Sequence, residues 1–163
     1  MMKFFETERN DEWIVEGDRY DNVEIDFSIR SDDLSLENVS KNLGLSCTRG
    51  FERGDEFLSG INNSCRSEEL WGVWVYESKH HVFSDKLTDH LDFILSVFEP
   101  RKEQLKPYLE DKAYMVRISI DFRESLAVAS CEFDKETMLR IMDICNSIGI
   151  GLVTDVRDSE EDD

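Results

Sequence analysis

Several residue types are scarce in this sequence, and each scarcity excludes a class of protein. Two prolines and eight glycines among 163 residues are too few for a collagen-like or low-complexity chain. No window approaches the roughly 18 consecutive apolar residues that a membrane-spanning helix needs. The N-terminus becomes acidic at Glu6, before any apolar run of signal-peptide length. We therefore expect a cytoplasmic protein that does not associate with a membrane.

Cysteines are few and carry no metal-binding pattern. Cys47, Cys65, Cys131 and Cys145 include no C-x-x-C pair and lack the spacing of zinc ligands. Cys131 and Cys145 lie within apolar patterns and are interpreted as small core residues. Cys47 and Cys65 flank a loop and could meet in space, but a reducing cytoplasm disfavours a stable disulfide. We expect no metal site and no cofactor.

Basic residues are the third scarcity. The chain has 19 lysines and arginines against 37 aspartates and glutamates, which gives a formal net charge of −18. Non-specific binding to nucleic acid needs basic side chains that neutralise phosphates, and anionic membranes repel an acidic surface. The composition therefore predicts no nucleic-acid partner and no membrane partner.

The apolar content is sufficient for one folded domain. Hydrophobic residues make up 40% of the chain, and the length fits a single domain. The acidic charge is concentrated at the two ends. We predict an acidic N-terminal extension at 1–22, which could add a short strand or an apolar clamp, one domain at 23–156, and an acidic disordered tail at 157–163.

Hydrophobic periodicity predicts alternating strands and helices. Val23, Ile25, Phe27 and Ile29 alternate with polar residues and indicate a strand. The other predicted elements, in chain order, are a helix capped by Ser35 and ended by Gly44, a strand at 70–76, a helix capped by Ser84 and ended near Pro100, a short helical piece at 101–110 broken by Pro107, a hairpin of strands over 114–133, a helix capped by Asp134 and ended by Gly149, and a strand at 152–156.

This order predicts an α+β fold. We expect a mixed or antiparallel sheet of about five strands with its helices packed on one face, in a ferredoxin-like sandwich. The hairpin 114–133 should be its best-defined strand pair. The stretch 46–66 has no hydrophobic periodicity and is longer than an ordinary connection between secondary-structure elements, so we predict a functional or mobile loop there.

Several phrases of the sequence resemble the bacterial family called domain of unknown function 4279. They are Phe27 to Leu45 (strand, acidic turn, short helix, Leu-Gly), Thr48 to Asp55 with Arg53-Gly54-Asp55, Gly72-Val73-Trp74, and Ile148-Gly149 to Asp155. The resemblance implies a fold, a bacterial or phage-like setting and a stand-alone cytoplasmic protein. It carries no established activity, and some members accompany toxin systems as suspected immunity proteins.

Catalytic signatures are absent. The sequence has no nucleophile elbow, phosphate-binding loop, zinc-protease helix or dinucleotide-binding glycine motif. The histidines His80, His81 and His90 lie in or before one predicted helix, and His90 is interpreted as a packed side chain. A hydrolase that uses Asp26, His81 or Asp155 is an alternative, but no nucleophile–base–orienter set is evident. A non-enzymatic role is therefore favoured, with no catalytic residue assigned.

Two aspartates lie on the polar sides of predicted strands. If the strands that carry Asp26 and Asp155 are neighbours, the carboxylates could form a pair in which one pKa is raised. The alternative is an ordinary solvated sheet face.

The segment 46–66 offers a candidate ligand site. Arg49, Arg53 and Arg66 lie among glycines such as Gly54, and Trp74 follows. Arginine forks beside an aromatic surface recognise carboxylates, phosphates or planar ligands. The alternative interpretation is that these arginines pair with nearby acids and fix the loop.

The acidic surplus supports the leading hypothesis, an interaction protein that neutralises a basic protein partner. A strong negative field steers a basic partner and speeds association. Asp26, Glu77 and Asp155 would provide charge, and exposed Trp74 and Tyr76 would provide anchors. Nuclease toxins are basic because they bind nucleic acid, so an immunity protein would have this composition. The alternative is that the charge only keeps the protein soluble.

Overall fold

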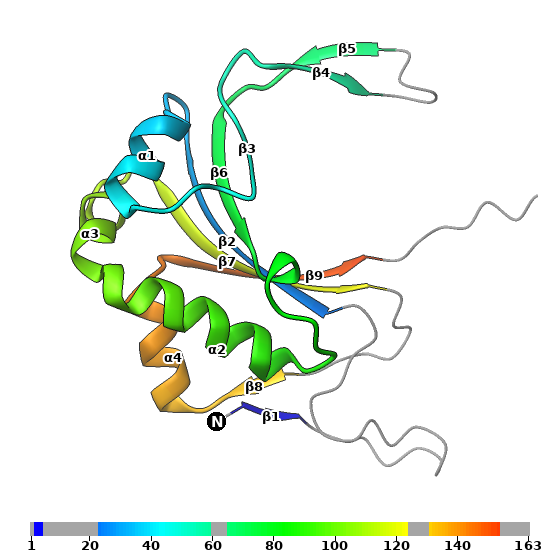
Figure 1. Ribbon diagram of the computed structural model, residues 1–163, viewed down its shortest axis with the longest axis vertical. Helices are drawn as coiled ribbons and strands as arrows, with labels where there is room; N and C mark the ends of the chain where they lie inside the picture. Colours follow the sequence, from blue (N-terminus) through cyan, green and yellow to red (C-terminus); the bar gives the residue numbers. More distant parts are fainter. Residues whose placement is uncertain (1, 5–22, 60–64, 124–130, 154–163) are drawn as a thin grey trace, which may run out of the picture.

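The structure is a computed structural model that describes residues 2–4, 23–59, 65–123 and 131–153 (Figure 1). Most of the predicted extension 1–22 and the whole predicted tail 157–163 lie outside these ranges. Within the extension, strand β1 (Met2–Phe4) pairs antiparallel with β8 (Cys131–Phe133). The N-terminal segment therefore contributes a short strand, which was one of its two predicted roles.

A five-stranded mixed sheet forms the centre of the structure. In spatial order its strands are β3 (Arg49–Phe51), β6 (Gly72–Glu77), β2 (Val23–Ser31), β7 (Met115–Arg123) and β9 (Ser147–Val153). Neighbouring strands from β3 to β7 pair antiparallel, whereas β9 pairs parallel with β7. The long central strand β2 is therefore enclosed between two partners.

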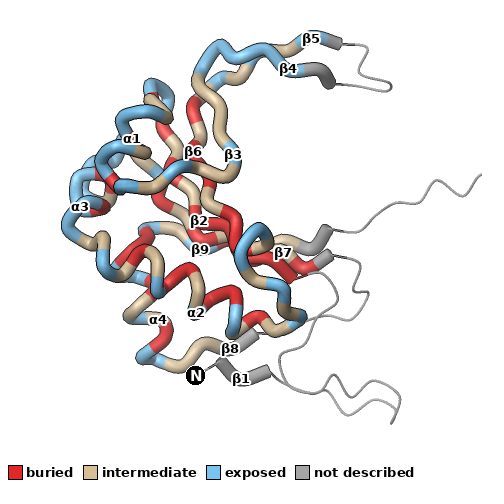
Figure 2. Tube along the Cα trace, in the orientation of Figure 1, coloured by how far each residue is buried: buried red, intermediate tan, exposed pale blue. Residues whose placement is uncertain are grey.

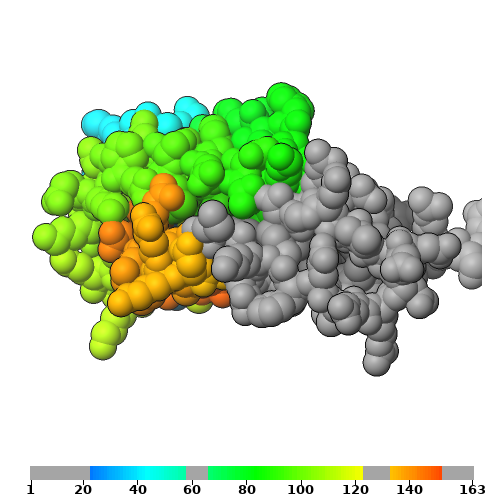
Figure 3. All heavy atoms as spheres, turned by 90° about the horizontal axis from the view of Figure 1, so that it is seen from below, coloured from blue at the N-terminus to red at the C-terminus, as the bar shows by residue number. Residues whose placement is uncertain are grey.

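The α-helices of the described residues gather on one face of this sheet (Figure 1). They are α1 (Leu36–Leu43), α2 (Leu87–Phe98), α3 (Lys102–Glu110) and α4 (Lys135–Met142), with short 3₁₀ turns η2 (Ser78–His80) and η3 (Glu99–Arg101). Seen from below, α2 and α4 lie side by side on this face (Figure 3). The predicted α+β class is confirmed. Within the described ranges, no helix has the length and apolar composition needed to cross a bilayer.

The hydrophobic core lies between the helices and the sheet, where Figure 2 shows the buried segments. Alternate residues of β2 point into it, and Ile25, Phe27 and Ile29 are fully buried. Phe98 of α2 stacks on Phe27 with a ring-centroid distance of 3.7 Å and meets Trp74 of β6 edge-on. Burial of such large apolar side chains is the main source of stability for a domain of this size.

Helix ends follow the sequence signals where a side chain caps the backbone. Ser35 accepts a hydrogen bond from the Asn38 amide, and Gly44 ends α1 with φ 64°. Asp134 accepts from the Thr137 amide and begins α4. The predicted cap Ser84 is wrong by two residues, because α2 starts after Lys86.

Three predictions about the second half of the chain are wrong. Strand β8 pairs with β1, so the described part of 114–133 is not a hairpin; β7 instead pairs with β2 and β9. Helix α3 continues through Pro107, which is exposed. Proline removes one backbone hydrogen bond, and this loss does not end the helix. Helix α4 ends at Met142, and Gly149 lies within β9, which starts earlier than the predicted strand at 152–156.

The predicted loop 46–66 contains strands. After β3, the chain forms β4 (Glu56–Ser59), which pairs antiparallel with β5 (Cys65–Glu68). This β4–β5 hairpin projects from the side of the sheet that faces away from the helices (Figure 1). Local alternation is weak in these short strands, so the sequence pattern did not indicate them.

Candidate functional site

The candidate site lies on the face of the sheet opposite the helices. Even-numbered residues of β2 point to this face, because Ile25, Phe27 and Ile29 point into the core. The register of the sheet brings further polar residues beside them. Asp26 lies opposite Glu77 of β6, and Glu24 lies opposite Asp121 of β7.

These four carboxyl groups, Glu24, Asp26, Glu77 and Asp121, form what we call the acidic cluster. Glu24, Asp26 and Glu77 have exposed fractions of only 6%, 8% and 4%. Burial of carboxylates is unfavourable unless charge or hydrogen bonds compensate it. The interpretation of this surface as a solvated sheet face is therefore wrong for Asp26.

Glu77 is the best-compensated member of the cluster. Lys79 Nζ lies 2.9 Å from its Oε1, and Arg49 Nε lies 3.5 Å from the same atom. Thr48 Oγ1 donates to Oε2 at 3.0 Å, and His80 Nε2 lies 3.1 Å from Oε2. Burial raises the pKa of Glu77, but the hydrogen bonds and charges of these neighbours outweigh it and lower that pKa to about 2.

Asp26 has the opposite electrostatic character. Burial and, after it, the charges of Glu24, Glu77 and Asp121 raise its pKa from 3.8 to about 7, against the opposing effect of Arg49. Arg49 Nη2 lies 3.7 Å from Asp26 Oδ2, which is an ion-pair distance but too long for a hydrogen bond. The other oxygen, Oδ1, is buried without any hydrogen-bond partner.

The cations near the cluster hold its most buried members in place. Besides Glu77, Lys79 Nζ contacts Glu24 Oε2 at 3.3 Å. Lys79 and Arg49 are the lysine and arginine side chains of the described residues that form ion pairs with the cluster. Lys79 thus contacts Glu24 and Glu77, and Arg49 contacts Glu77 and Asp26.

Two glycines of the edge strand β9 leave room for charged side chains on the remainder of this face. The Arg117 guanidinium lies over Gly149, and the Asp121 carboxylate lies over Gly151, where any Cβ would collide with these groups. Further along the face, the Arg30 guanidinium lies 3.6 Å from the centroid of the Trp71 ring. The face is thus acidic near the start of β2 and basic near its end.

The residues of the predicted partner-binding set separate into two groups. Asp26 and Glu77 meet as direct cross-strand neighbours. Trp74 is fully buried on the opposite face, so its predicted role as an exposed anchor is wrong. Tyr76 lies on the same face, where it is half-buried and packs against His81 and Phe93. Strand alternation explains the difference, because Trp74 and Tyr76 share the parity that points into the core. Asp155 lies outside the described residues.

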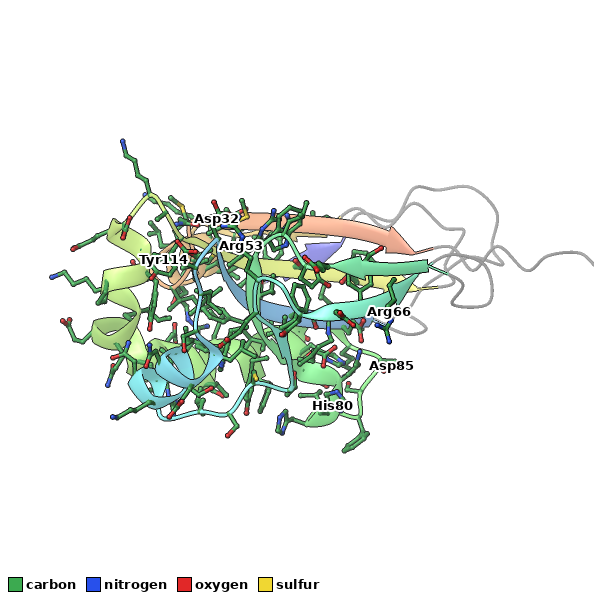
Figure 4. The ribbon with its side chains drawn as sticks, turned by 90° about the horizontal axis from the view of Figure 1, so that it is seen from above. Asp32, Arg53, Arg66, His80, Asp85 and Tyr114 are labelled. Carbon is green, nitrogen blue, oxygen red and sulfur yellow. The ribbon has the colours of Figure 1, made fainter. Side chains whose placement is uncertain are left out.

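The three arginines of 46–66 do not converge on one place. Arg49 joins the acidic cluster, Arg53 lies 3.9 Å from Asp33, and Arg66 lies 3.4 Å from Glu56. Figure 4 places Arg53 and Arg66 at separate parts of the segment. Gly54 supports a turn with φ 89° rather than a ligand cradle. This arrangement matches the alternative interpretation, in which the arginines pair with nearby acids.

The histidines have structural roles. His90 is buried; its Nδ1 lies 2.7 Å from Ser78 Oγ, and its Nε2 lies 2.9 Å from the Ser84 carbonyl oxygen. Ser78 Oγ also accepts from the Ile25 amide. This Ser–His pair resembles a nucleophile and its base, but both residues are buried, so it anchors η2 to β2 and α2. The interpretation of His90 as packed is confirmed. Among the described residues, no group of three side chains is suited to hold a metal ion.

The comparisons with known proteins identify the family. A family model described as Domain of unknown function (DUF4279) matches residues 21–155. The chain belongs to the DUF4279 family. The resemblance inferred from 23–156 is therefore confirmed. Comparison with curated proteins and with solved structures found no match.

Sequence analysis missed four members of the site in this DUF4279 domain: Glu24, Thr48, Lys79 and Asp121. The alternation of β2 placed Glu24 on the same face as Asp26, which is a usable signal. Asp121 reaches the cluster through the pairing of β2 with β7, and Thr48 and Lys79 flank the ends of β3 and β6; the sequence pattern does not specify these pairings.

Glu77→Gln should destabilise the DUF4279 domain by about 3 kcal/mol at pH 7, the value of a pKa lowered from 4.5 to about 2. Because the folded-state pKa is the lower one, this contribution exists above about pH 4.5 and disappears as the pH falls towards 2. Urea unfolding at several pH values measures it. Glu110→Gln removes an exposed carboxylate and serves as the control; equal losses in both variants would contradict the assignment.

Proposed function

We propose that this DUF4279 domain is a non-enzymatic bacterial protein of the cytoplasm that binds a basic partner protein, as an immunity or antitoxin-type inhibitor. The observation that carries the proposal is the acidic cluster on the helix-free face of the sheet. The cluster places four carboxyl groups on neighbouring strands, and the charges of Glu24, Glu77 and Asp121 help raise the pKa of Asp26. A partner that brings positive charge would compensate it.

The net charge of the whole chain also supports a basic protein partner. A net charge of −18 creates a long-range field that raises the association rate of basic proteins, especially at low salt. Toxin nucleases present basic surfaces to nucleic acid. A protein that covers such a surface would inhibit them by occupying the nucleic-acid site.

Two other functions have less support. Catalysis would need an accessible nucleophile with a base, and the Ser78–His90 pair is buried. A ligand site built on the arginines of 46–66 and Trp74 would need these side chains to converge, yet the arginines pair with separate acids and Trp74 lies in the core.

A pull-down from the encoding bacterium at rising salt tests the proposal. We expect a basic protein to be retained at low ionic strength and to elute as salt is raised. With that protein purified, Glu24→Gln/Asp121→Asn should slow association about tenfold or more, because both charges face the proposed binding surface. Stopped-flow or surface-plasmon measurements give the rate.

The control is Asp92→Asn/Glu103→Gln, which removes the same charge from exposed positions on α2 and α3. It should change the association rate by less than about threefold. Thermal melts check that both double variants are folded. If no partner is retained even at low ionic strength, or if the two double variants behave alike, the proposal fails.

A further inference from the structure

We propose that Arg30 and Arg117 together form a binding site for a phosphate monoester on the face of the sheet opposite the helices. The two arginines lie beyond the acidic cluster, towards the end of β2. Because this site takes an anion, the inference goes beyond the proposed function and does not depend on a basic partner.

The first argument is that neither guanidinium has an acceptor. Arg30 lies over the Trp71 ring, but within the described residues neither Arg30 nor Arg117 forms an ion pair or donates a side-chain hydrogen bond. Both are half-buried, in a chain with 37 acidic and 19 basic side chains. The other arginines with described side chains all have oxygen acceptors: Arg49, Arg53, Arg66 and Arg140 pair with carboxylates, and Arg101 donates to the carbonyl oxygens of Leu43 and Val97.

The second argument is that the two arginines are neighbours. The strand register places Ser28 opposite Arg117, and Arg30 is the next residue of β2 on the same face. The two arginines are therefore diagonal neighbours on adjacent strands, and long side chains span this separation. Two like charges at such a separation repel each other, whereas an anion held between them is attracted by both.

The third argument is that neighbouring residues hold both guanidinium groups in position. Arg30 Cζ lies 3.6 Å from the centroid of the Trp71 ring, a contact that leaves its N–H groups free to donate at their edges. Arg117 leans over β9, where Gly149 leaves the space that its guanidinium occupies. Of the nitrogens of this guanidinium only Nε is buried without a partner, so a ligand can reach Nη1 and Nη2.

Two guanidinium groups match a phosphate monoester better than a carboxylate. Each guanidinium can donate two parallel N–H bonds, and a phosphate monoester has three free oxygens and a charge of about −1.5 to −2 near pH 7. A carboxylate has two oxygens and a single negative charge, so it satisfies one guanidinium. Ser28, which lies on the same face beside both arginines, adds a hydroxyl group without adding negative charge.

The test is an NMR titration of the whole chain with inorganic phosphate at constant ionic strength of about 0.15 M, where charges beyond roughly 8 Å are screened. We expect saturable amide shifts centred on Arg30, Arg117 and Gly149. Arg30→Gln and Arg117→Gln should each weaken binding about tenfold or more, because each removes charge-assisted hydrogen bonds. Arg53→Gln removes the same charge from a side chain that already pairs with Asp33, and it should change the affinity by less than about threefold.

Gly149→Ala separates the position of a guanidinium from its charge. The new Cβ would occupy the space of the Arg117 guanidinium, whose flexible end can move away, so the chain should still fold. Phosphate should then bind about tenfold more weakly although the net charge is unchanged. Thermal melts check the folding of every variant, and native affinity in a folded Gly149→Ala would overturn the placement of Arg117 in the site.

Two further ligands identify the source of the phosphate group. Glycerol 3-phosphate represents a small phosphorylated metabolite, and an otherwise uncharged peptide with one phosphoserine represents a modified protein; the one that binds more tightly gives the source. The site is overturned if saturable shifts are absent or centred on another surface, or if Arg53→Gln loses as much affinity as Arg30→Gln. Acetate that binds as tightly as phosphate, or failure of both monoesters to bind, overturns the choice of ligand. None of these results bears on the basic partner, which the pull-down tests separately.

Discussion

Asp26→Asn should stabilise the protein by about 1–4 kcal/mol at pH 8, where most substitutions of buried residues destabilise. The upper value corresponds to a pKa raised from 3.8 to about 7. Between these values the folded state keeps a proton that the unfolded state releases, so native stability falls as the pH rises from about 4 to about 7. Asparagine has nearly the same shape and carries no charge, so it removes this loss.

Urea unfolding at pH 4, 6 and 8 measures the effect. At pH 4 the folded aspartate is protonated, and the variant should differ little from the native chain. Asp33→Asn measures the general relief of repulsion in a chain of net charge −18, because the Asp33 side chain is 93% exposed. Parallel pH profiles for the two variants would mean that Asp26 ionises like a surface carboxylate.

Trp74→Ala should destabilise the protein by about 3–5 kcal/mol, the range for large aromatic side chains removed from a core. Trp74 is fully buried, it contacts Phe98 edge-on, and its Nε1 donates to Ser40 Oγ at 2.9 Å. The substitution creates a cavity beneath β6 and leaves a hydroxyl without its donor. A loss of this size is a large part of the stability of an ordinary domain.

Chemical denaturation compares this variant with Trp74→Phe, which keeps most of the apolar volume but lacks the indole N–H. We expect the phenylalanine variant to lose clearly less stability than the alanine variant. Normal stability of Trp74→Ala would contradict the core position. A folded Trp74→Ala that had lost only partner binding would restore the anchor role that the burial of Trp74 argues against.

The first prediction connects stability with function. A buried carboxylate with a raised pKa weakens the native state, and sites that conflict with stability are often the sites of binding. Glu77 shows that this sheet face can stabilise a carboxylate with local donors. Asp26 lacks them.

Much of the fold was predictable because its determinants are local. The alternation of β2, the cap Ser35 and the left-handed Gly44 each depend on neighbours within a few residues. The α+β class followed from the order of such signals, and the family from phrases of the sequence that resemble it. By contrast, Pro107 inside α3 and the strands within 46–66 depend on surrounding structure that local propensity does not describe.

The pairing of the strands could not be predicted from the sequence pattern. The short connection after β7 favoured a hairpin over 114–133, yet β7 is enclosed by β2 and β9, and β8 pairs with β1. Pairing partners far apart in sequence are selected by the total burial of both faces of a sheet. Alternation within a single strand contains no information about that choice.

The sequence by itself determined that Asp26 lies on the polar side of a strand in an acidic α+β domain. Only the tertiary structure decided that this side is buried there, because β6 and β7 flank β2 and place Glu77 and Asp121 beside it. The period of a strand fixes the side to which a residue points. The electrostatic environment on that side is fixed by neighbouring strands, whose residues come from distant parts of the chain.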